Sequence, residues 1–319
     1  MIFLFIGYQT LFILMKLKHC IESQQFSKEL LFELFNLADS LRENNGELLK
    51  GKIMASLFYE PSTRTRLSFE SAMLKLGGRV IGTENAKEFS SAVKGESLED
   101  STRVISSYSD VIVIRHDVDG SAKLCSSVSK VPVINAGDGK GQHPTQALLD
   151  VYTIYLEFGK IDGLKIAMVG DLSSGRTVRS LCYLLGKFEN VEIIFVSPEN
   201  LKMKDDIKDY LNRHNVKFRE ESDLDKILTE VDVIYMTRIQ KERISFEDYE
   251  AAMGKFVINE TNFNFVPKSS RIMHPLPHVE EIELPIVLEN FDERVAYFRQ
   301  AENGLYIRMA LLVHLLGVD

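Results

Sequence analysis

Apolar residues along this chain follow two alternating spacings, and the alternation predicts an α/β protein. Short continuous apolar runs are typical of buried strands, whereas apolar residues three or four positions apart are typical of helices with one buried face. In the first half, strand-like runs occupy 52–58, 79–82, 110–114 and 131–135, and helix-like stretches occupy 26–44, 64–76, 97–108 and 144–158. Strands that alternate with helices form a parallel sheet with helices on both faces. We therefore expect a doubly wound parallel sheet.

The second half of the chain repeats this alternation. Strand-like runs occupy 165–170, 192–197, 231–237, 256–259 and 271–274, and helices are expected from 175 onward and over 204–214. The pattern predicts a second doubly wound parallel sheet, followed by a long apolar helix over 301–316. The segment 84–95 is polar, and its composition alone is typical of a mobile surface loop.

The stretch 58–70 carries the most specific chemical signal in the chain, because a strand ends there, the chain turns at a proline, and a helix begins. A helix start presents unpaired backbone N–H groups and the positive end of the helix dipole, and it often binds phosphate. Ser62, Thr63 and Thr65 can donate hydroxyl hydrogen bonds to phosphate oxygens. Arg64 can hold two such oxygens with its planar guanidinium. Taken alone, the motif is also compatible with a capped helix that carries surface arginines.

The composition indicates a globular protein and excludes some classes of function. The chain has 319 residues, of which 45% are hydrophobic and 26% charged, as in a globular protein of two domains of about 150 residues each. The formal net charge of -8 argues against general nucleic-acid binding, which needs a basic surface. An acidic protein with anionic substrates must concentrate positive charge locally, and the candidates are Arg64, Arg115, Arg176 and Arg238.

The cysteines and the N-terminal residues indicate in which compartment the protein is found. The three cysteines, Cys20, Cys125 and Cys182, are far apart and suggest neither a disulfide framework nor a zinc site, so we expect a reducing, cytoplasmic setting. The hydrophobic run 1–15 is shorter than the roughly 20 residues that span a membrane and has no basic segment before it. We expect no membrane association, and we expect either that Met15 is the natural start or that residues 1–14 are a dispensable extension.

Four separated motifs carry a family resemblance. They are Ser-Thr-Arg-Thr-Arg at 62–66, Arg-His at 115–116, His-Pro-Thr-Gln at 143–146 and His-Pro-Leu-Pro at 274–277. In this order they resemble the carbamoyltransferases, specifically the catalytic chain of the aspartate enzymes, from about residue 16 to the C-terminus. The resemblance implies transfer of the carbamoyl group of carbamoyl phosphate to L-aspartate, giving N-carbamoyl-L-aspartate and phosphate, an early step of pyrimidine biosynthesis.

The resemblance assigns roles to individual residues and implies no cofactor and no metal. The residues implied in catalysis are Arg64, Thr65, Lys94, Arg115, His143 and Gln146. Those implied in binding carbamoyl phosphate are Ser62, Thr63, Arg64, Thr65, Arg115, His143, Gln146, Pro275 and Leu276. Those implied in binding aspartate are Lys94, Arg176, Thr177, Arg238, Gln240 and Leu276. Glu60 stands where the family forms ion pairs that close the two domains.

The resemblance also implies an assembly. One domain, 16–143 with 300–319, would bind carbamoyl phosphate, a second, 158–299, would bind aspartate, and 144–157 would be the connecting helix. The C-terminal helix would return to the first domain. The family forms a homotrimer in which Ser90 and Lys94 reach a neighbouring subunit's site. Regulatory chains or other pathway enzymes are possible further partners.

Two other functions fit the sequence less well. Ornithine carbamoyltransferases resemble His-Cys-Leu-Pro at the late turn, whereas position 275 is proline, and Arg238 with Gln240 suits a second carboxylate. A non-catalytic assembly partner would be expected to lack several of the motif residues, which are all present. The chain departs from many aspartate enzymes at His278 and at Ser173-Ser174, which puts only fine contacts in doubt.

Overall fold

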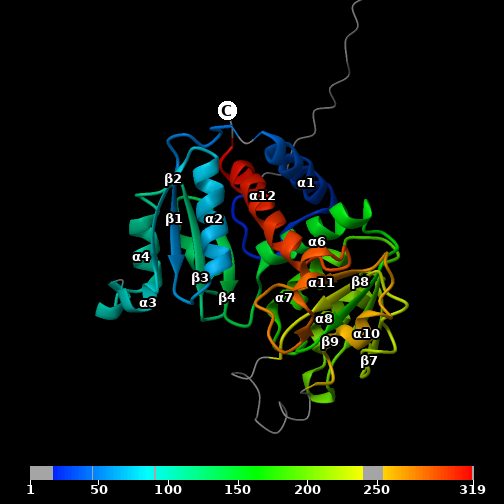
Figure 1. The fold of residues 1–319 in the computed structure, drawn as a ribbon. Coiled ribbons are helices and arrows are strands. Elements are labelled where there is room, and N and C mark those ends of the chain that lie inside the picture. The colour runs from blue at the N-terminus through cyan, green and yellow to red at the C-terminus, as the bar shows by residue number, and fades with distance from the viewer. Residues whose placement is uncertain (1–16, 45, 90, 240–253, 318–319) are drawn as a thin grey trace, which may run out of the picture.

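The computed structural model describes residues 17–44, 46–89, 91–239 and 254–317, and it places two parallel sheets in two domains (Figure 1). The first sheet has the order β2 (Arg79–Glu84), β1 (Ile53–Phe58), β3 (Val111–His116), β4 (Val133–Asp138). The second has the order β10 (Arg271–Met273), β8 (Val233–Met236), β5 (Lys165–Val169), β6 (Glu192–Val196), β7 (Lys217–Glu221). All neighbouring strands are parallel, so the predicted fold class is confirmed.

Helices connect the strands on both sides of each sheet. The longer ones are α1 (Lys28–Glu43), α2 (Thr63–Lys75), α4 (Leu98–Ile105), α5 (Ser121–Val128), α6 (Pro144–Phe158), α7 (Arg176–Leu185), α8 (Asp205–Arg213) and α12 (Tyr297–Leu316). Shorter ones are η1 (Ser23–Gln25), α3 (Ala86–Phe89), η2 (Ser91–Lys94), η3 (Glu199–Leu201), α10 (Glu260–Phe263) and α11 (Ile286–Phe291). Among the described helices, none is long and apolar enough to cross a membrane.

The structure differs from the sequence-based prediction in several places, and the helices α5 and α11 were not predicted. The expected strand 256–259 is not part of the second sheet, because β9 (Ile258–Asn259) pairs instead with β11 (Ile282–Glu283). Strand β7 was missed, since it is a charged, half-exposed edge strand without an apolar run. The polar segment expected to be a loop contains the short helices α3 and η2, in which Ala86 supplies a buried contact.

Strand side chains alternate between two hydrophobic cores. Met54 and Phe58 of β1 point into a core shared with α1, α2, α6 and α12, and Ala55 and Leu57 point into a second core on the other face. This period of two is the expected geometry of a strand that is covered on both sides. Burying one such leucine or phenylalanine side chain contributes about 1.5–3 kcal/mol of stability.

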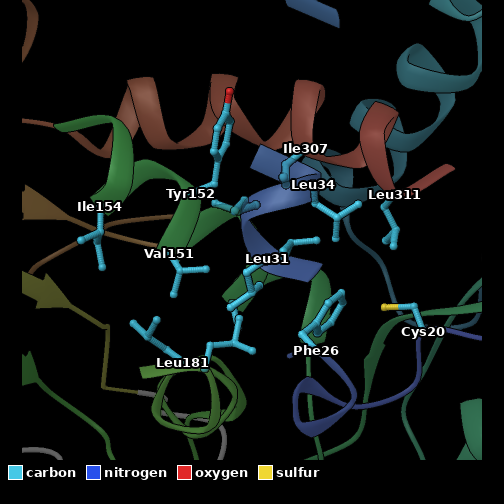
Figure 2. Close-up of a cluster of buried hydrophobic side chains, with 14 of the residues drawn as sticks. Cys20, Phe26, Leu31, Leu34, Val151, Tyr152, Ile154, Leu181, Ile307 and Leu311 are labelled. Carbon is cyan, nitrogen blue, oxygen red and sulfur yellow. The ribbon is translucent and has the colours of Figure 1, made fainter. Parts of the chain in front are cut away.

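The larger core is continuous between the two domains. Figure 2 shows side chains of α1, α6, α7 and α12 that pack in one cluster, among them Leu34, Val151, Leu181, Ile307 and Leu311. Helix α12 packs against α1, α2 and α6, so it returns to the first domain although it follows the second sheet in sequence. The predicted return of the C-terminal helix is confirmed, and the shared core fixes how the two sheets face each other.

Candidate active site

The strand orders place a ligand site between the two sheets. In the first sheet the order changes direction between β1 and β3, and in the second it changes between β5 and β8. Ligands of open parallel sheets bind at the carboxyl ends of the strands where such a change occurs. A cavity of about 590 Å³ lies there, and residues at or just after the carboxyl ends of β1, β3, β5, β8 and β10 line it together with the start of α6 and part of α12.

The N-terminus of α2 opens into this cavity. Ser62 is the N-cap residue, yet its side chain makes no capping hydrogen bond, so the hydroxyl remains available to a ligand. Thr63, Arg64 and Thr65 form the first turn and line the cavity, where their backbone N–H groups have no partner within the helix. The Arg64 side chain is exposed and forms no ion pair with any described residue. This turn has the donors that an oxyanion requires.

Two arginines from different sheets share one carboxylate. Glu60 Oε2 lies 3.1 Å from Arg115 Nε and 3.0 Å from Arg176 Nη2. Burial, followed by repulsion from Arg176, lowers the pKa of Arg115 to about 10, and the charge of Glu60 opposes this shift. One carboxylate therefore neutralises only part of the positive charge, and the cavity still favours anionic ligands.

Gly137, at the end of β4, makes room for both guanidinium groups. It has a φ of +113°, and a Cβ there would lie 3.2 Å from Arg176 Cζ and 3.3 Å from Arg115 Nη1. Arg176 also donates a 2.7 Å hydrogen bond to the carbonyl oxygen of Gly139. The glycines predicted to allow close approach to a ligand thus bring the arginines of the two domains together.

His143 precedes α6 and is held by the second domain. Pro144 occupies the first turn of that helix, and the backbone N–H of His143 donates to Ser180 Oγ of α7 at 2.9 Å. The imidazole is buried beside Arg115, Arg176 and Arg308. Burial and then these positive charges lower the pKa of His143 well below its usual value, so the ring is neutral at physiological pH.

We expect His143 to remain neutral from about pH 8 to about pH 6. Protonation would place a fourth positive charge in a buried arginine cluster. NMR spectra of protein with 13C-labelled histidine, recorded over this range, would show no titration of the resonance that disappears in His143→Ala. A midpoint near the ordinary histidine value would contradict the expectation.

The turn after β10 is fixed by hydrogen bonds. The backbone N–H of His274 donates to Gln300 Oε1 at 2.8 Å, and that of Leu276 donates to His274 Nδ1 at 2.8 Å. Leu276 has a left-handed backbone, with φ of 56°, and it lines the cavity with Pro275. His274 Nε2 lies 2.8 Å from Glu281 Oε1. The turn is therefore held rigidly at the cavity wall, where its backbone carbonyls can meet a ligand.

The two halves of the chain match two domains of one family. Residues 18–156 match "Aspartate/ornithine carbamoyltransferase, carbamoyl-P binding domain", and residues 162–315 match "Aspartate/ornithine carbamoyltransferase, Asp/Orn binding domain". The chain belongs to the aspartate/ornithine carbamoyltransferase family.

Named relatives cover nearly the whole chain. The chloroplastic aspartate carbamoyltransferase of Arabidopsis thaliana is 55% identical over 94% of this chain and 78% of its own length. The aspartate carbamoyltransferase catalytic subunit of Methanocaldococcus jannaschii is 49% identical over 94% of this chain and 98% of its own length. The crystal structure of Trypanosoma cruzi aspartate transcarbamoylase with carbamoyl aspartate and phosphate superposes with a TM-score of 0.89, at 38% identity, over 94% of this chain and 96% of that one.

The cavity brings together most of the residues that the carbamoyltransferase motifs predict. They are Ser62, Thr63, Arg64, Thr65, Arg115, His143, Gln146, Arg176, Thr177, Arg238, Pro275 and Leu276. Lys94 does not line it; this residue is exposed at the end of η2, in the first domain. Ser90 and Gln240 lie outside the described residues, as does the N-terminal run 1–15.

The carbamoyltransferase cavity also contains residues that the motifs did not predict. Gln300 and Arg308 enter it from α12. Arg308 is buried, donates a hydrogen bond to Ser68 Oγ, and lies 5.1 Å from the centre of the Phe69 ring. The sequence signal that could have identified Arg308 is its position as the single arginine in the apolar stretch 301–316, because a buried charge in such a helix needs a partner.

The positions that depart from the family's pattern are not among the residues that line the cavity. Ser173 Oγ donates to Asp171 Oδ1 at 3.0 Å, and the backbone N–H of Ser174 donates to the same oxygen at 2.9 Å. His278 Nε2 lies 3.1 Å from Glu289 Oε1. These residues shape the loops that carry the site.

Proposed function

We propose that this chain transfers the carbamoyl group of carbamoyl phosphate to the amino group of L-aspartate. The observation that carries the proposal is one cavity that joins the helix N-terminus of 62–65 in the first domain to Arg176 and Arg238 in the second. The aspartate nitrogen attacks the carbonyl carbon, the bond from that carbon to the bridging oxygen breaks, and phosphate leaves. A proton lost by the nitrogen completes the exchange.

The first-domain residues would bind carbamoyl phosphate. Ser62, Thr63, Arg64 and Arg115 would hold the phosphate, and Thr65, Arg115 and His143 would donate to the carbonyl oxygen. Gln146, with the backbone of Pro275 and Leu276, would bind the carbamoyl NH2. A neutral His143 suits this role, because it can donate to the negative oxygen of the tetrahedral intermediate without bringing a proton that would quench the attacking amine.

The second-domain residues would bind the acceptor. Arg176, Thr177 and Arg238 would hold the two carboxylates of aspartate, with Gln240 and a neighbour's Lys94. Aspartate rather than ornithine is supported by this excess of cations and by relatives of 45% to 55% identity that are aspartate carbamoyltransferases. The chain accordingly belongs to the aspartate-specific branch of its family.

An assay with labelled carbamoyl phosphate tests the proposed function. Purified protein is given L-aspartate, L-ornithine or no acceptor, and the products are separated. We expect labelled N-carbamoyl-L-aspartate only with aspartate. Labelled citrulline would favour the ornithine reaction, and no product with either acceptor, from protein of normal fold, would favour a non-catalytic assembly role.

Replacing Arg238 with alanine is expected to raise the KM for aspartate at least about tenfold, because it removes a charge-assisted hydrogen bond to a carboxylate. The KM for carbamoyl phosphate should change little, since Arg238 follows β8 in the second domain. Steady-state kinetics with each substrate varied in turn measure both values. Arg64→Ala, which should show the reverse preference, is the matched comparison, and equal weakening of both substrates in Arg238→Ala would refute the assignment.

The proposal includes a homotrimer in which Ser90 and Lys94 serve a neighbour's site. Lys94 lies outside the cavity of its own chain, which supports a role in another. Leu67 and Leu74 of α2 and Ile81 of the edge strand β2 are exposed apolar side chains on the same domain. A second copy that covers them would remove apolar surface from water. Light scattering at several concentrations would measure the assembly.

The remaining expectations also form part of the proposal. We place the enzyme in the cytoplasm, at an early step of pyrimidine biosynthesis, and its domain limits at 16–143 with 300–319, 144–157 and 158–299. Three free, buried cysteines, Cys20, Cys125 and Cys182, are compatible with a reducing compartment. Because the Arabidopsis relative is designated chloroplastic, cell fractionation is the direct test of location. Co-purification would reveal regulatory chains or other pathway enzymes.

A further inference from the structure

A buried carboxylate lies directly behind the cavity. Asp150 belongs to α6, one turn after Gln146, and is 0% exposed. Its Oδ1 accepts hydrogen bonds from Gln146 Nε2 at 2.9 Å and from Gln300 Nε2 at 2.6 Å, and its Oδ2 accepts one from Tyr235 OH at 2.8 Å. Three elements, α6, α12 and β8, thus donate to one side chain.

These hydrogen bonds determine which end of the Gln146 amide faces the ligand. Asp150 Oδ1 accepts from both amides whether or not Oδ2 carries a proton, so the side-chain nitrogen of Gln146 points to Asp150. The oxygen of the amide is left for the cavity, which Gln146 lines. Gln146 therefore presents an acceptor, and its natural ligand is an N–H group.

The same argument applies to Gln300. Its nitrogen donates to Asp150, and its oxygen accepts the backbone N–H of His274 at 2.8 Å. Asp150 is therefore connected through one side chain to the turn 274–277. The backbone carbonyls of that turn are acceptors as well. Gln146 and the 274–277 turn, the two parts of the cavity wall that Asp150 holds, therefore both present hydrogen-bond acceptors.

Burying the Asp150 carboxylate at this position costs free energy, which points to a functional role. Burial raises the pKa of Asp150 to about 7, while the hydrogen bonds from Gln300, Tyr235 and Gln146 and the charge of Arg308 favour the ionised form. Tyr235 and Arg308 are the titratable groups that face it from β8 and α12. A well-packed apolar residue in such a position is often as stabilising as a buried charge.

We propose that Asp150 is a positioning residue that selects for the NH2 of the carbamoyl group, by holding the Gln146 oxygen and, through Gln300, the 274–277 turn toward it. The inference rests on the proposed function. It makes Asp150 a determinant of substrate choice between acyl phosphates that carry an N–H donor and those that carry a methyl group in its place.

The test compares carbamoyl phosphate with acetyl phosphate, which keeps the phosphate and carbonyl but replaces NH2 by CH3. Asp150→Leu fills a similar volume but removes both carboxylate oxygens, so the Gln146 and Gln300 amides lose the acceptor that orients them. We expect the ratio of the two dissociation constants to move toward acetyl phosphate by at least about tenfold. Acetyl phosphate affinity itself should change little.

A matched control lies one helical turn away. Asn303 Nδ2 of α12 donates to Thr153 Oγ1 of α6 at 3.0 Å, so Thr153→Val breaks a buried hydrogen bond between the same two helices. It should lower the melting temperature and leave the ratio unchanged. A similar shift of the ratio in Thr153→Val would mean that any disturbance of the helix pair suffices, and would overturn the specific role of Asp150.

Gln300→Met keeps the inference testable if Asp150→Leu fails to fold, because it removes only the connection to the turn and should also shift the ratio. An unchanged ratio in folded Asp150→Leu, or in Gln300→Met where Asp150→Leu is unfolded, overturns the proposal.

The unsubstituted protein distinguishes failure of this inference from failure of the proposed function. If it makes N-carbamoyl-L-aspartate and Asp150→Leu keeps the ratio, only the positioning role is refuted. If the unsubstituted protein makes no product and does not prefer carbamoyl phosphate, the proposed function is refuted.

Discussion

Replacing Arg64 with alanine is expected to lower kcat by about two to three orders of magnitude, as for the loss of one donor to charge that develops in a transition state. Arg64 stands on the first turn of α2, where the N-terminal N–H groups already favour an anion. In the proposed phosphate site, its guanidinium would stabilise the negative charge that grows on the leaving phosphate as the bond breaks. Stopped assays at saturating substrate measure the change.

The fold should survive this substitution. The Arg64 side chain is exposed and has no ion pair among the described residues, so its removal leaves no buried partner unsatisfied. Arg213→Ala, an exposed arginine of α8 that lies outside the cavity lining, is the control and should keep normal activity. Near-normal turnover in Arg64→Ala, or a melting temperature that falls in step with activity, would contradict its place in the phosphate site.

Two inactive variants are expected to restore activity when their subunits are mixed. Lys94→Ala removes the residue that we assign to a neighbour's site, and His143→Ala damages the cavity itself. In the proposed trimer, some mixed sites would combine an intact Lys94 from one subunit with an intact cavity from the next. At equal ratio and random exchange, about a quarter of the sites would be complete. Activity is measured after dissociation and reassembly of the mixture.

The physical reason is the position of Lys94. It lies on the short helix η2, outside the cavity of its own chain, and ordering an exposed segment costs roughly 1–2 kcal/mol per residue unless other contacts offset it. A neighbouring subunit can supply those contacts. Lys87→Ala, in the preceding helix α3, removes only a surface ion pair with Asp117 and should remain active alone. No recovery after verified subunit exchange would show that Lys94 does not act across an interface.

Local patterns predicted those parts of the site that are contiguous in sequence. The end of β1, the turn and the N-terminus of α2 follow one another within 58–65, so their spacing alone indicated an anion site. The helix 144–158 was predicted with the bounds that the structure has, because Pro144 and the following apolar spacing define both ends.

Contacts between distant segments could not be predicted from local spacing. Asp150 and Gln300 are 150 positions apart, and nothing in the periodicity of either helix pairs them. The shared carboxylate of Glu60 likewise depends on how the two sheets face each other. Strand β9 was misplaced because a short apolar run does not reveal which strand will pair with it.

The return of α12 to the first domain has a consequence for protein synthesis. Domains ordinarily fold in turn as they leave the ribosome, the N-terminal one first. Here the apolar faces of α1, α2 and α6 are completed by a helix that is translated only after the whole second sheet. The first domain must therefore wait, with its core open, while its successor is made, and the nascent chain needs protection from aggregation during that interval.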